Sequence, residues 1–172
     1  MSRYLSRAGV IAALYFVLTV APLLSAISFG PIQFRISEAL TVLAYFEPAA
    51  IPGLWIGAAA ANAYASPFGL IDVVFGGGLT LVAAYLTWLI KRPAPALLPP
   101  VILNGLGVAF MLKYLVAGPL KVKEAFIFVL GAVTVGEAVV IYGLGLPLLM
   151  LILRSGVFVR PELRKKIYPE KG

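Results

Sequence analysis

The hydrophobic content of this chain exceeds what the core of a soluble domain of its size can bury. Hydrophobic types make up 62% of the 172 residues, and charged types make up 12%. Soluble domains average about 45–50% apolar and about 25% charged residues, so the surplus apolar surface must face lipid. The same composition excludes a disordered chain. The sequence therefore predicts an all-α integral membrane protein in the lipid bilayer of the cell membrane, with a single transmembrane domain over residues 1–172.

Several kinds of chemistry are excluded by missing residue types and motifs. The chain contains neither cysteine nor histidine, which removes thiolate and imidazole metal ligands and the usual general base. It also lacks the P-loop motif, the zinc-protease His-Glu-x-x-His motif and the Gly-x-Ser-x-Gly nucleophile motif. We therefore expect no metal, no cofactor and no enzymatic reaction from this chain, and no ATP hydrolysis by the chain alone.

Turn and charge signals divide the apolar sequence into six segments. Gly30-Pro31, Ser66-Pro67 and Gly118-Pro119 mark breaks between segments, and the basic Lys91-Arg92-Pro93 marks another. A kink is predicted at residues 143–147, which read GLGLP. The predicted helices cover, approximately, residues 8–25, 38–46, 49–64, 67–90, 99–116 and 121–154.

The number of spans depends on residues 36–64, which form either one helix or two. One helix of this length would be about 44 Å long, too long for a hydrocarbon core of about 30 Å without tilt. With two helices the chain has six spans, and ten of its 14 Lys and Arg residues fall on the side of the termini. Cytoplasmic loops carry the excess of Lys and Arg, so both termini are predicted in the cytoplasm, with a basic cytoplasmic tail over residues 155–172. The net charge of +7 follows this end-of-span pattern and does not indicate nucleic-acid binding.

Polar residues inside the predicted spans are candidates for a binding site, because ionisable groups at membrane depth are costly and usually mark a ligand or ion path. A water-filled cavity open to the outside and closing near Glu137 would accommodate all of them. Structural alternatives stay open: Glu137 pairing with a basic residue, Asp72 at a helix N-terminus, Glu38 pairing with Arg35, and the amides bonding between helices. The predicted site residues are Arg35, Glu38, Asn62, Asp72, Asn104 and Glu137.

Small residues predict close approach at two places. Ala8 and Ala12 form a flat stripe on the first helix, which serves either internal packing or docking onto another membrane protein. Gly76 lies four residues after Asp72, on the same face of its helix. Its bare backbone would be covered either by a neighbouring helix or by a flat ring beneath the Asp72 carboxylate.

Several segments together resemble one family. They are residues 31–40 (PIQFRISEAL), 51–54 (IPGL), Asn62, 66–72 (SPFGLID) and 99–104 (PPVILN). In these segments the chain is similar to the QueT-type family, the substrate-binding S-components of energy-coupling factor (ECF) transporters for queuosine precursors. The resemblance extends over about residues 8–154.

The resemblance implies a function and a set of partners. The fold would be the six-helix S-component bundle, with the substrate captured from outside under a lid formed by residues 27–35. The Ala8-x-x-x-Ala12 stripe would dock onto the transmembrane coupling subunit of the transporter. Two cytoplasmic ATPases would drive transport, in agreement with the missing P-loop, and no nucleic acid would bind.

The candidate residues suit a 7-deazaguanine. Its N1–H and exocyclic amine can both donate to one carboxylate, and we expect Glu137 or Asp72 to accept them. An amide from Asn62 or Asn104 suits the carbonyl O6, and an aminomethyl cation on the precursor would need a second carboxylate. The alternatives are an S-component for another flat vitamin, an autonomous channel or proton-coupled carrier built around Glu137, and a small membrane enzyme.

Overall fold

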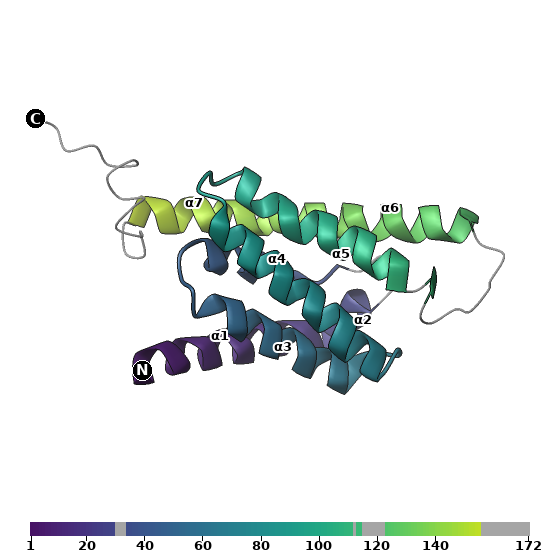
Figure 1. Ribbon diagram of the computed structural model, residues 1–172, viewed down its shortest axis with the longest axis horizontal. Helices are drawn as coiled ribbons and strands as arrows, with labels where there is room; N and C mark the ends of the chain where they lie inside the picture. The colour runs from purple at the N-terminus through teal and green to yellow at the C-terminus, as the bar shows by residue number, and fades with distance from the viewer. Residues whose placement is uncertain (30–33, 112, 115–122, 156–172) are drawn as a thin grey trace, which may run out of the picture.

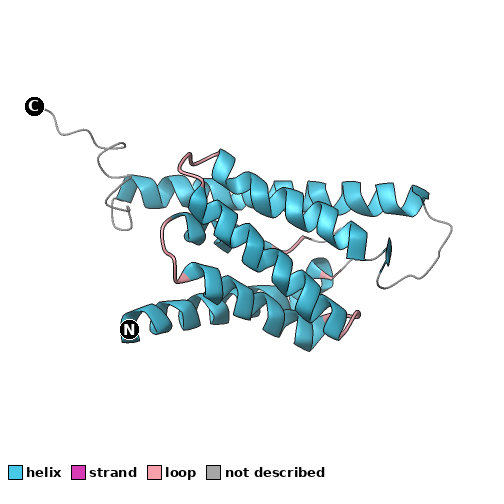
Figure 2. Cartoon of the chain, viewed as in Figure 1, coloured by secondary structure: helices cyan, strands magenta, loops and turns pink. Residues whose placement is uncertain are grey.

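The computed structural model describes residues 1–29, 34–111, 113–114 and 123–155. Every regular element within those ranges is helical, which confirms the all-α prediction (Figures 1 and 2). The predicted ends at residues 116 and 121, much of the lid segment and nearly all of the basic tail lie outside the described residues. The elements are α1 (Ser2–Val20), α2 (Pro22–Ser28), η1 (Ile36–Tyr45), α3 (Ala50–Ala65), η2 (Asp72–Gly76), α4 (Gly77–Leu89), η3 (Pro95–Leu97), α5 (Leu98–Met111), α6 (Lys123–Val140), η5 (Ile141–Gly145) and α7 (Leu146–Ser155).

Three of the described helices are long and apolar enough to cross a membrane. They cover Ser2–Val20, Asp72–Leu89 and Phe126–Ser155, and the shorter apolar helices cover Ile36–Tyr45 and Pro95–Met111. In Figure 1, Met1 and the end of α7 lie at one end of the bundle, and α2 lies at the other. We call the first the terminal end and the second the α2 end. The helix α1 packs mainly on α3, and α5 packs on α6.

The first helix differs from its prediction at both ends. It begins at Ser2, six residues earlier than predicted, because nothing between residues 2 and 8 breaks a helix. It ends at Val20, because Pro22 has no backbone N–H and its ring collides with the preceding turn of a continuous helix. Pro22 instead opens the short helix α2, where a proline at the first position is favourable.

Residues 36–64 form two elements, as the charge argument predicted, but the first is a 3₁₀ helix rather than an α-helix. At about 2.0 Å per residue, the ten residues of η1 extend about 20 Å, so this helix by itself covers about two thirds of a core of about 30 Å. The first turn of η1 is buried in the bundle and carries Ser37 and Glu38.

Two of the elements named above are π turns. The first is η2, which follows a turn in which Gly69 has a φ of +58°. The second is η5, at the predicted kink, where the helix widens and continues into α7 in nearly the same direction (Figure 1). The widening has a clear cause, because Pro147 cannot donate a backbone hydrogen bond and crowds the carbonyl four residues earlier.

Two apolar clusters hold the terminal half of the bundle together. In one, Ile11, Leu54 and Ala84 pack around the ring of Tyr15. In the other, Tyr45 of η1 packs with Leu97, Ile141 and Leu149. The side chains of η1 therefore change from polar at its start to apolar at its end, and the polar start positions the candidate site.

Candidate functional site

The six predicted site residues all lie in the interior of the bundle. Arg35 is 7% exposed, Asn104 6%, Asp72 3%, Glu137 2%, Glu38 1% and Asn62 0%. None of them points into hydrocarbon, although they come from a loop and five different elements. The structure therefore brings together residues more than 100 positions apart in the sequence; their role in binding stays a prediction.

Arg35 and Asp72 form the ion pair of the site. Nη2 of Arg35 lies 3.6 Å from Oδ2 of Asp72, and the hydroxyl of Ser66 donates to the same oxygen at 2.6 Å. The Asn62 amide donates to the main-chain carbonyl of Asp72 at 2.9 Å. The Arg35 guanidinium also lies 5.0 Å from the centre of the Phe29 ring. The Asp72 carboxylate therefore has a cation and a hydroxyl donor of its own.

Glu38 and Glu137 lie on the other side of the site, around Asn104. The Tyr15 hydroxyl donates to Oε1 of Glu38. The Asn104 amide interacts with the carboxyl groups of both Glu38 and Glu137. Oε2 of each glutamate is buried and has no hydrogen-bond partner among the described residues. Two carboxylate oxygens are thus left without a donor, which costs free energy in an apolar interior.

Several residues that support the site were missed by the sequence analysis. Tyr15 holds Glu38, and the hydroxyl of Thr19 donates to that of Ser37 at 2.7 Å. Ser66 was predicted only as part of a break between two segments. A signal for Tyr15 and Thr19 was present, because they lie four residues apart on one stripe of a helix that is otherwise apolar from Ala8 onward.

Gly76 provides a close approach for a neighbouring helix. A Cβ atom at this position would collide with the carboxylate of Asp72 and come within 2.9 Å of the amide nitrogen of Asn62. The bare backbone is therefore covered by Asp72 itself and by an amide from α3, the first of the two alternatives stated above.

The Ala8 and Ala12 stripe of α1 packs against α3. A Cβ atom on Gly53 would lie 2.7 Å from the Ala8 carbonyl oxygen, and one on Gly57 would lie 2.8 Å from that of Ala12. The first alternative for this stripe, internal packing, is therefore present in the structure. Docking of a partner through Ala8 and Ala12 stays a prediction.

Comparison with known proteins gives the family of the chain. A sequence profile of the QueT transporter family matches residues 5–154. The chain belongs to the QueT transporter family. Over 74 residues it is 48% identical to the queuosine precursor transporter QueT of Lactococcus lactis subsp. cremoris (strain MG1363), an alignment that covers 43% of this chain and 43% of that relative. No solved structure matches the chain.

Family membership confirms the resemblance seen in the sequence. With the apolar helices, it makes the chain a multi-pass membrane protein. The QueT family is one of transporters, so the expectation that the chain is not an enzyme agrees with it. Within the described residues, no group of His, Cys, Asp and Glu is arranged to hold a metal ion.

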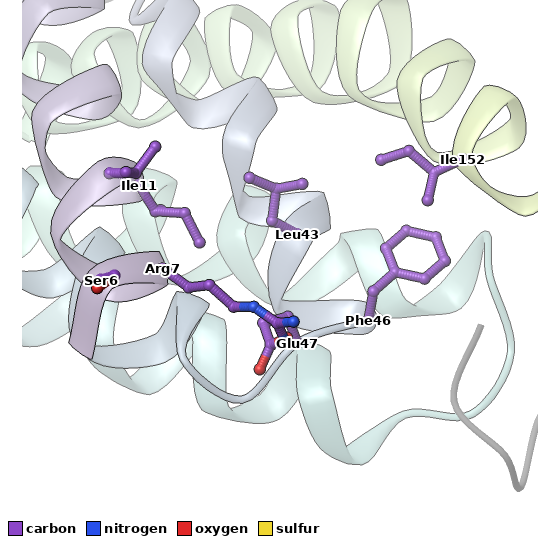
Figure 3. A pocket seen from close by; sticks show the side chains of 8 residues that line it. Ser6, Arg7, Ile11, Leu43, Phe46, Glu47 and Ile152 are labelled. Carbon is purple, nitrogen blue, oxygen red and sulfur yellow. The ribbon is translucent and has the colours of Figure 1, made fainter. Parts of the chain in front are cut away.

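A pocket of about 410 Å³ lies away from this site, toward the terminal end. Figure 3 shows its walls: α1 contributes Arg7 and Ile11, η1 contributes Leu43, and Ile152 faces them from α7. Arg7 forms an ion pair with Glu47 at the edge of the pocket. The lining is otherwise mostly apolar, unlike the buried cluster around Arg35.

Proposed function

We propose that this QueT-family chain is the substrate-binding membrane subunit of an ECF-type importer. It captures a queuosine precursor of the 7-deazaguanine type from outside the cell. It then delivers the precursor by docking onto a transmembrane coupling subunit driven by cytoplasmic ATPases. The observation that supports a binding role is the buried polar cluster, in which Glu38, Asn62 and Glu137 each keep an unpartnered acceptor oxygen.

The unpartnered oxygens match the edge of a guanine-like ring. Such an edge presents two adjacent N–H donors, and a carboxylate accepts both in a charge-assisted pair. The binding free energy comes from replacing an unsatisfied acceptor with a satisfied one, which is worth about 1–3 kcal/mol for each group. We assign recognition of the ring edge to Glu137, which has an unpartnered oxygen, or to Asp72, with amides from Asn62 and Asn104 nearby.

The proposal includes six spans with both termini in the cytoplasm. Support comes from the arrangement in Figure 1, in which Met1 and the end of α7 lie at the same end of the bundle. The described basic residues at that end include Arg3, Arg7, Arg92 and Arg154. An excess of basic residues favours the cytoplasmic side. Reaction of single cysteines at positions 2 and 69 with an impermeant thiol reagent in intact cells tests this topology: only position 69 should react.

Ligand binding to the purified protein tests the proposed substrate. We expect 7-deazaguanines to bind the wild type and to lose at least about 10-fold in affinity in Glu137→Gln or Asp72→Asn, since each change removes a charged acceptor. Glu47→Gln is the matched control, because Glu47 lies at the terminal pocket and pairs with Arg7 there. Unchanged affinity in both site variants would remove these residues from the site.

Transport assays test the coupling. Uptake into vesicles should require the coupling subunit and ATP. Uptake by this chain alone, driven by a proton gradient, would favour a carrier built around Glu137 over an ECF subunit.

The exposed face of α1 allows docking to be tested without disturbing the packing on α3. Gly9 and Ala13 are exposed, and a Cβ atom on Gly9 would meet nothing within 4 Å. Ala8→Trp and Ala12→Trp test the predicted stripe, but both would also push α1 away from α3. Gly9→Trp and Ala13→Trp test the neighbouring stripe in a correctly folded chain. If α1 docks, the tryptophan variants of at least one stripe should reduce co-purification of the coupling subunit. The Gly9→Trp and Ala13→Trp variants should still bind the ligand.

A further inference from the structure

The pocket at the terminal end is a groove that the proposed function does not use. The helices α1 and α7 each pack on η1, and the groove lies between them with η1 as its floor (Figure 3). Its volume of about 410 Å³ falls within the range of about 300–1,000 Å³ that is typical of sites for small molecules. A ligand for this groove must be mostly hydrocarbon, because the walls are mostly apolar. They consist mainly of Val10, Ile11, Leu43, Phe46 and Ile152.

The polar residues of the groove lie together at the edge nearest the terminal end of the bundle. Along α1, Ser6 and Arg7 come first, and Ile11 lies about 6 Å deeper than Arg7, since an α-helix rises about 1.5 Å per residue. Along η1 the chain runs the other way, so that Leu43 is deep and Glu47, just after the helix, lies at the edge. Two elements therefore show the same change from polar to apolar with depth. A phospholipid of the adjoining leaflet shows it too, with its headgroup outermost and its chains deeper.

The polar edge of the groove is held in place by contacts between α1 and the segment after η1. Arg7 forms an ion pair with Glu47, and the hydroxyl of Tyr4 donates to the carbonyl of Pro48 at 3.4 Å. Arg3 lies one turn before Arg7 on α1, and both arginines are exposed. Among the described residues of this edge, two guanidinium groups thus stand against one carboxylate. This balance of charge favours an anionic headgroup over a neutral or cationic one.

We propose that this groove binds one anionic phospholipid, with an acyl chain between α1 and α7 and the phosphate at Arg7. The proposal does not depend on the substrate proposed above. Arg7 can bind the phosphate and keep Glu47, because a guanidinium has five N–H donors. The acyl chain contacts protein on several sides in the groove, whereas a lipid on a convex helix surface contacts it on one side only. The groove lies beside lipid, because α1 is one of the helices long and apolar enough to cross a membrane.

A photoreactive lipid tests the site on the wild-type protein purified in detergent. The probe is phosphatidylglycerol with a diazirine on one acyl chain. After irradiation, the labelled peptides should come from α1, η1 and α7, and the labelling should saturate at one lipid per chain. Unlabelled phosphatidylglycerol should compete at least about 5-fold better than phosphatidylcholine with the same acyl chains, which is the factor expected for one basic residue near a membrane surface.

Two pairs of matched variants locate the chain and the headgroup. Ile152→Trp fills part of the groove and should abolish the saturable labelling. Leu151→Trp makes the same change at the next position of α7, where 67% of the side chain is exposed and does not line the groove, and should leave the labelling intact. Arg7→Gln should reduce the preference for phosphatidylglycerol to within about 2-fold. Arg92→Gln removes a positive charge outside the groove lining and should keep the full preference. Thermal melting of each variant checks that it is folded.

Four outcomes would overturn the proposal. Equal competition by phosphatidylglycerol and phosphatidylcholine would show that the groove does not recognise the headgroup. An equal loss of preference in Arg7→Gln and Arg92→Gln would show that only the general surface charge attracts the lipid. Labelling that is spread over all exposed helices and insensitive to Ile152→Trp would show only the lipids that surround any membrane protein. A photoreactive amino acid at position 152 that links to a second copy of the chain or to a coupling subunit, and not to phospholipid, in cell membranes would show that the groove is a protein interface.

Discussion

The two halves of the bundle are built from different side chains. Toward the α2 end, the start of η1 encloses Glu38 and Ser37 beside Arg35 and Asp72. Toward the terminal end, the same helix encloses Val42 and Tyr45 in an apolar cluster. The polar half contains unpartnered acceptors, whereas the apolar half contains the two apolar clusters. A membrane protein can keep an unsatisfied binding site in one half because packing in the other half supplies the stability.

The largest expected effect tests the apolar half. Leu149→Ala removes a fully buried side chain of the apolar cluster and should lower the free energy of unfolding by about 2–5 kcal/mol. Leu151→Ala, in the same helix but with 67% of its surface exposed, is the control and should cost much less. Denaturation in detergent measures both. A similar cost for the two variants would show that α7 does not hold the bundle together.

Tyr15 joins the two halves, since its ring belongs to an apolar cluster and its hydroxyl donates to Glu38. Tyr15→Phe keeps the ring and removes a hydrogen bond to a buried carboxylate, so stability should fall by about 1.5–3 kcal/mol. Ligand affinity should fall as well, because Glu38 loses the group that orients it. Tyr64→Phe, on an exposed side chain, is the control. A loss of stability without any loss of affinity would separate Tyr15 from the site.

Glu137→Gln should have the opposite sign in the absence of ligand. The amide has nearly the same shape and removes an unmatched buried charge, so the free energy of unfolding should rise by about 1–3 kcal/mol. Affinity for the ligand should fall at the same time, as in other sites that trade stability for function. Melting curves without ligand measure the first effect. A destabilised variant would show that the carboxylate has a structural partner in the unliganded protein.

The convergence of the charged residues was predictable from the sequence. Arg35, Asp72 and Glu137 each lie within or next to apolar segments, and lipid excludes such groups, so they turn toward the interior. The division of residues 36–64 into two elements was predictable as well, because loop charge depends on the number of spans. The first conclusion rests on the cost of charge in lipid, and the second on the excess of basic residues in cytoplasmic loops.

The orientation of particular faces was not predictable. The helix α1 carries two neighbouring small-residue stripes, one with Ala8 and Ala12 and the other with Gly9 and Ala13, and the sequence does not decide which one meets α3. The 3₁₀ geometry of η1 was missed because periodicity over ten residues does not separate it from an α-helix. The bond from Tyr15 to Glu38 depends on how α1 and η1 pack together, which no local pattern specifies.

The smallest expected effect belongs to the charged pair at the terminal end. Arg7 and Glu47 form an ion pair whose side chains are 53% and 20% exposed. Exposed pairs contribute about 0–1 kcal/mol, because water screens them and ordering two long side chains costs entropy. Arg7→Gln should therefore change the free energy of unfolding by less than about 1 kcal/mol. The double variant Arg7→Gln, Glu47→Gln should have the same free energy of unfolding as the single variant. Ligand affinity should stay unchanged, because the pair is far from Arg35 and Asp72 along the bundle. A loss of affinity would mean that the two halves of the bundle are energetically coupled, and that the contrast between them does not separate stability from binding.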